Sequence, residues 1–256
     1  MIIDMIRRFK QKIQKEAVYG PFCKTGDPAF IEIAGLAGFD FVIIDLEHGP
    51  NSVESAQNLI RAACISNTLP IIRVKENNFS IIGEVLDIGA GGIQVPQITC
   101  PENAEEIIKF AKFAPSGMRG LCRFVRAAGY SDMDRFDYIK KANETIVILQ
   151  LESSKSITNI EDILKVDGID VIFVGPYDLS QSLGVPGQIE NPLVEEKMVE
   201  IVDVCSKNGI CVGTFVDTLD NAKKWKNAGV KYLSYNVDVG IFYEACSSIV
   251  KHIRSF

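Results

Sequence analysis

The sequence predicts an α/β fold, a single (β/α)8 TIM barrel with an extra N-terminal helix. Eight apolar runs rich in β-branched and aromatic residues are typical of buried parallel strands. Amphipathic segments separate these runs, and the chain of 256 residues matches the usual size of such a barrel. No linker or low-complexity segment interrupts the alternation, so we expect residues 1–256 to form one domain.

The expected elements follow one another at short intervals. An amphipathic helix is expected at about 4–16, before the first strand. The expected strands are residues 17–23, 41–46, 70–74, 91–96, 145–152, 171–176, 211–216 and 232–237. Helical patterns lie between them, among them 52–66, 101–113, 192–207 and 218–228. Asn208-Gly209 and Gly229 follow the last two helical patterns. Glycine at these positions is typical of a helix end, because it adopts the backbone conformation that ends a helix. Eight such units in about 250 residues favour a closed barrel over an open sheet.

Composition excludes several classes of protein. Apolar residues make up 47% and charged residues 23%, which suits a large core and excludes intrinsic disorder. A net charge of −6 argues against a nucleic-acid-binding protein with a broad basic face. No apolar run reaches the roughly 18 residues that a membrane helix needs. The seven cysteines form no CxxC motif and residues 1–16 lack a signal-peptide core, so we expect a reduced, cytoplasmic protein.

One connection, residues 114–144, is unusually long for a compact barrel. It contains Arg119, Arg123 and Arg126, with Tyr130 nearby. We expect it on the C-terminal face of the barrel, where active sites of this fold are built. The alternative is a solvated helical excursion with surface arginines, and the sequence leaves the role of these arginines open.

Polar residues gather where four expected strands end. The second strand leads into DLEHGP (45–50), the third carries Arg73, the fifth ends in QLE (150–152), and the sixth leads into GPYDLS (175–180). The C-terminal ends of barrel strands meet at one mouth, so we expect these groups to converge. A single acidic residue after a strand is often only a helix N-cap, but the whole set predicts an active site.

The residue types indicate the chemistry of that site. Glu152 and Asp178 suit Mg²⁺ or Mn²⁺, which take oxygen ligands and keep positions open for water and substrate. A zinc site is not expected, because His48 has no second histidine or cysteine at ligand spacing. Arg73 could bind an anion or a developing oxyanion. His48, three residues after Asp45, could be a base oriented by that carboxylate.

The turn that starts at Tyr177 is expected to begin a helix. Its backbone amides could hold a substrate carboxylate, because helix N-termini attract anions.

The segments FVIIDLEHGP, PIIRV, QLE and GPYDLS, in that order, resemble the class II pyruvate-dependent aldolases of the HpcH/HpaI type. These are the 4-hydroxy-2-oxoheptanedioate and 2-dehydro-3-deoxyglucarate aldolases. The resemblance extends from about Gly20 to Tyr235. The intervals also agree, with 25 residues from His48 to Arg73 and 26 from Glu152 to Asp178.

The resemblance implies a reversible cleavage of a 4-hydroxy-2-oxo acid to pyruvate and an aldehyde. It implies that Glu152 and Asp178 bind a divalent cation, Mg²⁺, Mn²⁺ or Co²⁺, and that Arg73 contacts the pyruvate moiety beside Gln150. The negative charge of the pyruvate enolate would collect on the C2 oxygen, where the cation and Arg73 lie.

The resemblance also implies that a His48–Asp45 dyad works through a metal-bound water, and that the protein is a homohexamer in which a barrel helix packs on a neighbour. Asp87 matches a residue that reaches the adjoining subunit's site, although it could equally be an ordinary helix-end carboxylate. Tyr177 and Cys122 depart from the residues of many relatives. Both lie on the side of the site where the aldehyde is expected to bind, so the identity of the aldehyde stays open.

Four other functions stay open. A Schiff-base aldolase needs an inner-strand lysine; the fifth and sixth strands contain none, and Lys75 is the nearest candidate. A lyase or mutase could act on an acyl-CoA or phospho-enol substrate, although no glycine-rich phosphate cradle follows the last strands. A binding barrel without activity would have no need of the His48–Asp45 pair. An oxaloacetate decarboxylase would use the same enolate.

Overall fold

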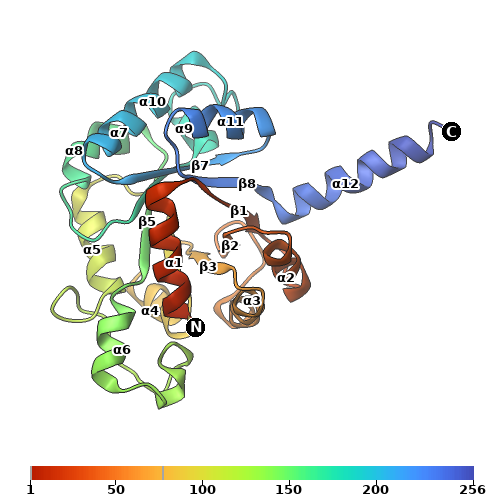
Figure 1. Ribbon diagram of the computed structural model, residues 1–256. Coiled ribbons are helices and arrows are strands. Elements are labelled where there is room, and N and C mark those ends of the chain that lie inside the picture. The colour runs from red at the N-terminus through yellow and green to blue at the C-terminus, as the bar shows by residue number, and fades with distance from the viewer. Residues whose placement is uncertain (1, 77) are drawn as a thin grey trace.

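The computed structural model describes residues 2–76 and 78–256 and forms a closed barrel of parallel strands in chain order (Figure 1). The last strand pairs with the first and closes the barrel. The strands are β1 (Val18–Cys23), β2 (Phe41–Asp45), β3 (Leu69–Arg73), β4 (Gly92–Val95), β5 (Ile146–Leu151), β6 (Val171–Val174), β7 (Cys211–Val216) and β8 (Tyr232–Val237). The predicted (β/α)8 barrel is confirmed, and each predicted strand end lies within two residues of the observed one.

Helices alternate with the strands and surround them (Figure 1). They are α1 (Ile2–Lys15), α2 (Pro28–Leu36), α3 (Val53–Ile65), α4 (Phe79–Asp87), α5 (Pro101–Ala111), η1 (Arg126–Ser131), α6 (Arg135–Ala142), α7 (Ser154–Thr158), α8 (Ile160–Ile163), α9 (Pro176–Ser182), α10 (Pro192–Lys207), α11 (Leu219–Asn227) and α12 (Asp238–Ile253). Side chains before several helices accept a bond from the first turn, as Ser52 and Asn191 do. None of the described helices is long and apolar enough to cross a membrane.

The predicted N-terminal helix is present as α1, which closes the N-terminal end of the barrel. Its buried residues pack on residues that begin the strands, such as Phe41, Leu69 and Tyr232. The rings of Phe41 and Tyr232 stack with centroids 4.1 Å apart, and Phe9 of α1 meets both edge-on at 5.9 and 6.2 Å. This aromatic cluster fills the barrel where a ligand could otherwise enter.

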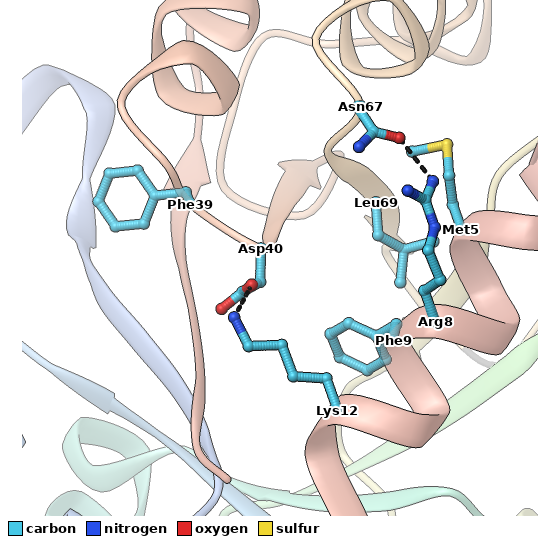
Figure 2. A pocket seen from close by; sticks show the side chains of 8 residues that line it. All are labelled: Met5, Arg8, Phe9, Lys12, Phe39, Asp40, Asn67 and Leu69. Atoms are coloured by element: carbon cyan, nitrogen blue, oxygen red, sulfur yellow. Dashed lines mark hydrogen bonds and ion pairs between the residues drawn. The ribbon is translucent and has the colours of Figure 1, made fainter.

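Polar contacts fix α1 at the edge of this cluster, where a small cavity opens beside the helix (Figure 2). Lys12 donates to Asp40 Oδ1 at 2.5 Å, and Arg8 donates to Asn67 Oδ1 at 2.6 Å.

The packing of β7 against β8 requires glycine at position 213. A Cβ at Gly213 would lie only 2.6 Å from the Tyr232 ring, too close for any other residue without a shift of that ring.

The long connection 114–144 lies at the N-terminal end of the barrel, so the prediction that it emerges on the C-terminal face is wrong. It follows a helix, α5, and precedes a strand, β5, and such connections lie at the end where strands begin. Lys112 donates to the carbonyl of Thr145, just before β5, and Arg7 of α1 pairs with Glu144. Its arginines are bound there: Arg119 to Asp87, Arg123 to Ser131 O and Arg126 to Ile88 O.

The last helix, α12, extends away from the barrel (Figure 1). Its exposed side chains include Phe242, Tyr243, Ile249 and Ile253, with exposed fractions of 58–72%. An apolar groove of about 320 Å³ lies between its first turns and α2. A helix with this much exposed apolar surface is typical of an interface.

We expect Phe9→Ala to lower the free energy of unfolding by about 3 kcal/mol, because it removes a ring that is 5% exposed from the aromatic cluster. Urea unfolding followed by circular dichroism measures this change. The control is Phe136→Ala, whose ring is 67% exposed and whose loss should cost under about 0.5 kcal/mol. Equal effects of the two substitutions would contradict the assigned role of α1.

Candidate active site

A cavity of about 210 Å³ lies at the C-terminal ends of the strands. It is bounded by side chains from the ends of β1, β2, β3, β5, β6, β7 and β8: Phe22, Lys24, His48, Arg73, Gln150, Phe173, Gly175, Pro176, Tyr177, Asp178, Phe215 and Val237. The structure therefore brings together residues that the sequence placed on four separate strand ends. Aromatic rings and charged side chains both contribute to this lining.

Arg73 is held by a buried carboxylate on the neighbouring strand. Asp45 and Arg73 are register partners at the ends of β2 and β3. Arg73 donates from Nε to Asp45 Oδ1 at 2.9 Å and from Nη2 to Oδ2 at 2.8 Å. Burial raises the pKa of Asp45, but the Arg73 guanidinium outweighs this and keeps the pKa below its usual value. Nη1 of Arg73 lies 3.1 Å from Glu47 Oε2, and its guanidinium covers the Phe22 ring.

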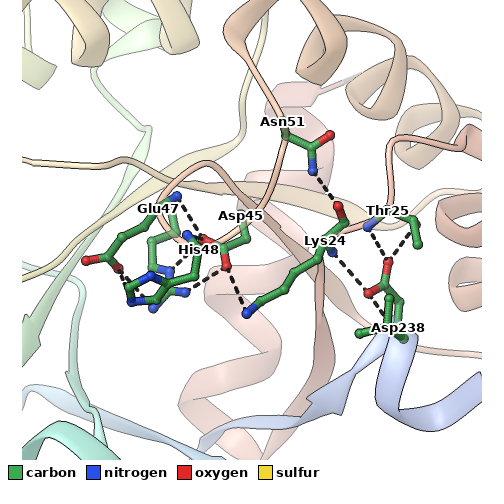
Figure 3. A network of polar contacts seen from close by, with 9 residues as sticks. Lys24, Thr25, Asp45, Glu47, His48, Asn51 and Asp238 are labelled. Atoms are coloured by element: carbon green, nitrogen blue, oxygen red, sulfur yellow. Dashed lines mark hydrogen bonds and ion pairs between the residues drawn. The ribbon is translucent and has the colours of Figure 1, made fainter. Parts of the chain in front are cut away.

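His48 does not make the expected side-chain pair with Asp45. Asp45 Oδ1 accepts a bond of 3.3 Å from the backbone N–H of His48, while both carboxylate oxygens face Arg73. The carboxylate beside the ring is Glu47, with Oε2 3.9 Å from His48 Nε2 (Figure 3). The His48 side chain is 62% exposed, so it can meet a ligand at the mouth of the cavity.

Glu152 is held by a chain of amides. Gln94 donates to Gln150 Oε1 at 2.7 Å, and Gln150 in turn donates to Glu152 Oε2. The backbone N–H of Gln97 donates to Glu152 Oε1 at 2.9 Å. Burial raises the pKa of Glu152, and the nearby Asp178 raises it further. Asp178 lies in the first turn of α9, which follows β6, and its carboxylate is close enough to Glu152 to affect the pKa of that group.

This pair fits a divalent cation. Two carboxylates that repel each other are the donor set that Mg²⁺ or Mn²⁺ accepts, with water and substrate completing the coordination. A Cβ at Gly175 would lie 3.0 Å from Glu152 Oε2, so glycine keeps this space open. Within residues 2–76 and 78–256 no group of three or more His, Cys, Asp or Glu side chains could hold a metal. The chain would therefore contribute these two carboxylates.

Tyr177 forms one wall of the cavity. Its hydroxyl donates to Asp217 Oδ2 at 2.7 Å, and its ring lies beside Phe215. Burial and the hydrogen bond to the Asp217 carboxylate raise the pKa of Tyr177 to about 12. The tyrosine is therefore a neutral hydrogen-bonding wall rather than a base.

Asp87 does not lie at this cavity in its own chain. It ends α4 at the other end of the barrel and accepts a bond of 2.6 Å from the buried Arg119. Its expected contact with a neighbouring subunit stays a prediction.

Three residues of the site were given no role by the sequence reasoning: Glu47, which lay within a predicted strand end, and Gln94 and Lys24, which did not. Glu47 lies two positions after Asp45, and this period-2 spacing could have placed both on one face of the chain. Lys24 directly follows β1 and lines the cavity, whereas Lys75 is exposed outside it. A search for polar residues after every strand, including the first, would have found Lys24.

A barrel with a carboxylate pair, a buried arginine and a histidine at its C-terminal mouth defines an enzyme that acts on a small anionic substrate. The chain belongs to the HpcH/HpaI aldolase/citrate lyase family, whose sequence model matches residues 19–245. It is thus an enzyme of the aldolase type, a carbon–carbon lyase. Members of this family generally depend on a divalent metal ion.

The chain is also similar to individual proteins over almost its whole length. The hydroxypyruvate/pyruvate aldolase of Roseobacter denitrificans is 32% identical over 246 residues, which cover 95% of this chain and 96% of the relative. The crystal structure of a family member from Burkholderia cenocepacia has a TM-score of 0.92 and 30% identity, covering 96% of this chain and 99% of that one. The citrate synthase SbnG has a TM-score of 0.87 and 32% identity, covering 98% and 97%.

We expect Arg73→Met to lower the free energy of unfolding by about 3 kcal/mol, because Asp45 would remain buried without its counter-ion. The double variant Asp45→Asn/Arg73→Met should recover part of this loss, since no buried charge remains. Urea unfolding measures both. As a control, Arg61→Met removes an exposed arginine that bonds only to Asn58 and Gln57 in the described contacts. A loss for Arg73→Met no larger than for the control would show that the pair does not support the fold.

Proposed function

We propose that this protein is a divalent-metal-dependent aldolase that reversibly cleaves a 4-hydroxy-2-oxo acid to pyruvate and an aldehyde. The observation that carries the proposal is the placement of Arg73, Gln150 and Asp178 around one small cavity, with Glu152 bonded to Gln150 and interacting with Asp178 beside it. The 32% identity to a hydroxypyruvate/pyruvate aldolase over almost the whole chain supports it.

Each residue has a defined task in this reaction. Glu152 and Asp178 would hold the cation, which would supply Lewis-acid chemistry to the 2-oxo acid. Arg73 donates two of its five N–H groups to Asp45 and is ion-paired with Glu47 through Nη1, so N–H groups remain to bind the developing negative charge on the C2 oxygen. The Gln150 amide, fixed by Gln94, lies beside it.

His48 takes the proton from the C4 hydroxyl as the C3–C4 bond breaks. C4 becomes the aldehyde carbon, the electron pair of the broken bond forms the pyruvate enolate, and the enolate then takes up a proton at C3 from the protonated His48 to give pyruvate. Glu47, at 3.9 Å, is the carboxylate that stabilises the protonated ring. Addition of pyruvate to an aldehyde is the reverse of these steps.

We also propose that the protein works as a homohexamer in the cytoplasm. The apolar surface of α12 and the adjoining groove support self-association. The Asp87–Arg119 pair lies at the N-terminal end of the barrel, where it could meet a neighbour's site. All seven cysteines are free, which suits a reducing compartment.

A second candidate function follows from the similarity to the citrate synthase SbnG. A site built for a 2-oxo acid would also accept oxaloacetate, either for decarboxylation or for condensation with an acetyl thioester to give citrate. Incubation with oxaloacetate, with and without acetyl-CoA, tests this function. Citrate formation without any cleavage of 4-hydroxy-2-oxo acids would replace the aldolase proposal.

We expect a chelator to abolish pyruvate release from 4-hydroxy-2-oxo acids, and Mg²⁺, Mn²⁺ or Co²⁺ to restore it. Glu152→Gln should weaken metal binding, measured by calorimetry, by roughly 10-fold or more, while the circular dichroism spectrum stays native. Glu161→Gln, an exposed carboxylate on α8, is the control. Full activity of the metal-free enzyme would exclude the proposed class of aldolase.

We expect His48→Ala to lower kcat for cleavage roughly 100-fold, because a positioned base is lost. Inhibition by pyruvate should change little, since Arg73 and the carboxylate pair hold that anion. The matched control is His252→Ala, which removes the other histidine of the chain, exposed on α12. Loss of pyruvate binding with an unchanged cleavage rate per complex would make His48 a binding residue instead.

A further inference from the structure

The cavity contains a second cation, Lys24, that the aldolase chemistry above does not use. Its side chain lines the cavity from the end of β1 and is 31% exposed. Its Nζ lies 4.0 Å from Asp45 Oδ2, beyond hydrogen-bond distance (Figure 3). No hydrogen bond from this ammonium to the described part of the chain is present, so its three N–H groups are available to a ligand.

The backbone around Lys24 is fixed on two sides. Asp238, at the start of α12, accepts bonds from the N–H groups of Lys24 at 3.0 Å and Thr25 at 2.9 Å. It also accepts a bond of 2.6 Å from the Thr25 hydroxyl. Asn51 donates to the Lys24 carbonyl at 3.2 Å. The backbone of Lys24 is therefore fixed, and only its flexible side chain can move within the cavity.

The position of Lys24 in the barrel is opposite the carboxylate pair. β1 and β5 lie four strands apart in a closed barrel of eight, and Glu152 follows β5 directly. A 2-oxo acid held by Arg73 and the carboxylate pair would reach Lys24 with the carbons that extend across the cavity. The other cation of the cavity, Arg73, is held by Asp45 and Glu47, and its remaining N–H groups serve the 2-oxo acid.

We propose that Lys24 determines specificity for the second substrate: its ammonium binds an anionic group, a carboxylate or a phosphate, carried by the aldehyde. The inference rests on the proposed aldolase function and adds the chemical class of its second substrate. A charge-assisted hydrogen bond from a partly buried ammonium is worth more than a neutral one, so it can decide between charged and uncharged aldehydes.

The test measures aldol addition of pyruvate to matched aldehydes. Butanal and succinic semialdehyde have the same four-carbon chain and differ in a terminal carboxylate. Glyceraldehyde and glyceraldehyde 3-phosphate differ in a phosphate. We expect the wild-type enzyme to prefer the charged member of one pair by roughly 10- to 100-fold in kcat/KM, and the preferred pair identifies the anion.

Lys24→Met should reduce this preference to about 3-fold or less, and Lys24→Arg should retain part of it because the charge is kept. Lys155→Met removes an exposed lysine on α7, outside the cavity, and should leave the preference as in the wild type. A wild-type enzyme without preference, or a preference that survives Lys24→Met, overturns the proposal. Equal losses for both members of a pair would show that Lys24 acts only on the Asp45–Arg73 pair, and this also overturns it.

Two further measurements separate this inference from the aldolase function itself. Exchange of the pyruvate methyl protons in D₂O reports enolate formation without any aldehyde. Exchange without a charge preference leaves the aldolase function intact and rejects the role of Lys24. Absence of both exchange and addition rejects the aldolase function, and the assignment of Lys24 with it. Borohydride trapping of pyruvate on Lys24 would make this lysine a nucleophile, which overturns the proposal as well.

Discussion

The buried ion pair of Asp45 and Arg73 is the interaction on which the site depends. It joins the last residues of two adjacent strands through two parallel hydrogen bonds, and Asp45 is fully buried. Taking both charges out of water is costly, so the pair is stable only because its geometry is complete. Its two bonds fix the plane of the guanidinium, and Glu47 and the Phe22 ring complete its surroundings. The N–H groups that remain can therefore only serve a ligand.

The charges around the cavity do not balance. Four carboxylates, those of Asp45, Glu47, Glu152 and Asp178, face two cations, Arg73 and Lys24. Burial and this excess of negative charge raise the pKa of Glu47 and of Glu152, and Asp178 contributes to both shifts. A divalent cation would supply the two missing positive charges. The same repulsion that disfavours the bare carboxylates thus creates affinity for a metal ion, as in other functional sites that maintain unfavourable charge arrangements.

The fold could be predicted from the sequence because buried parallel strands are continuous apolar runs and need no long-range information. The position of residues 114–144 was predicted wrongly, because its length and arginines suggested a binding loop. The chain order, helix before and strand after, would have placed it at the opposite end. The sequence predicted which strand-end residues form the site, but not which side chains they contact there. Asp45 is three residues from His48 yet binds Arg73, 28 residues away, and only the register of β2 and β3 decides this competition.

The two ends of the barrel have separate tasks, and one residue connects the site to the exterior. Phe9, Phe41 and Tyr232 stabilise the N-terminal end of the barrel. The polar mouth can therefore contain carboxylates that repel one another without loss of the fold. Asp238 belongs to both the mouth and α12: it begins the exposed helix and holds the backbone of Lys24. A second subunit that packs on α12 would also fix Asp238, and through it the backbone of Lys24. Assembly and the choice of the second substrate would then depend on the same carboxylate.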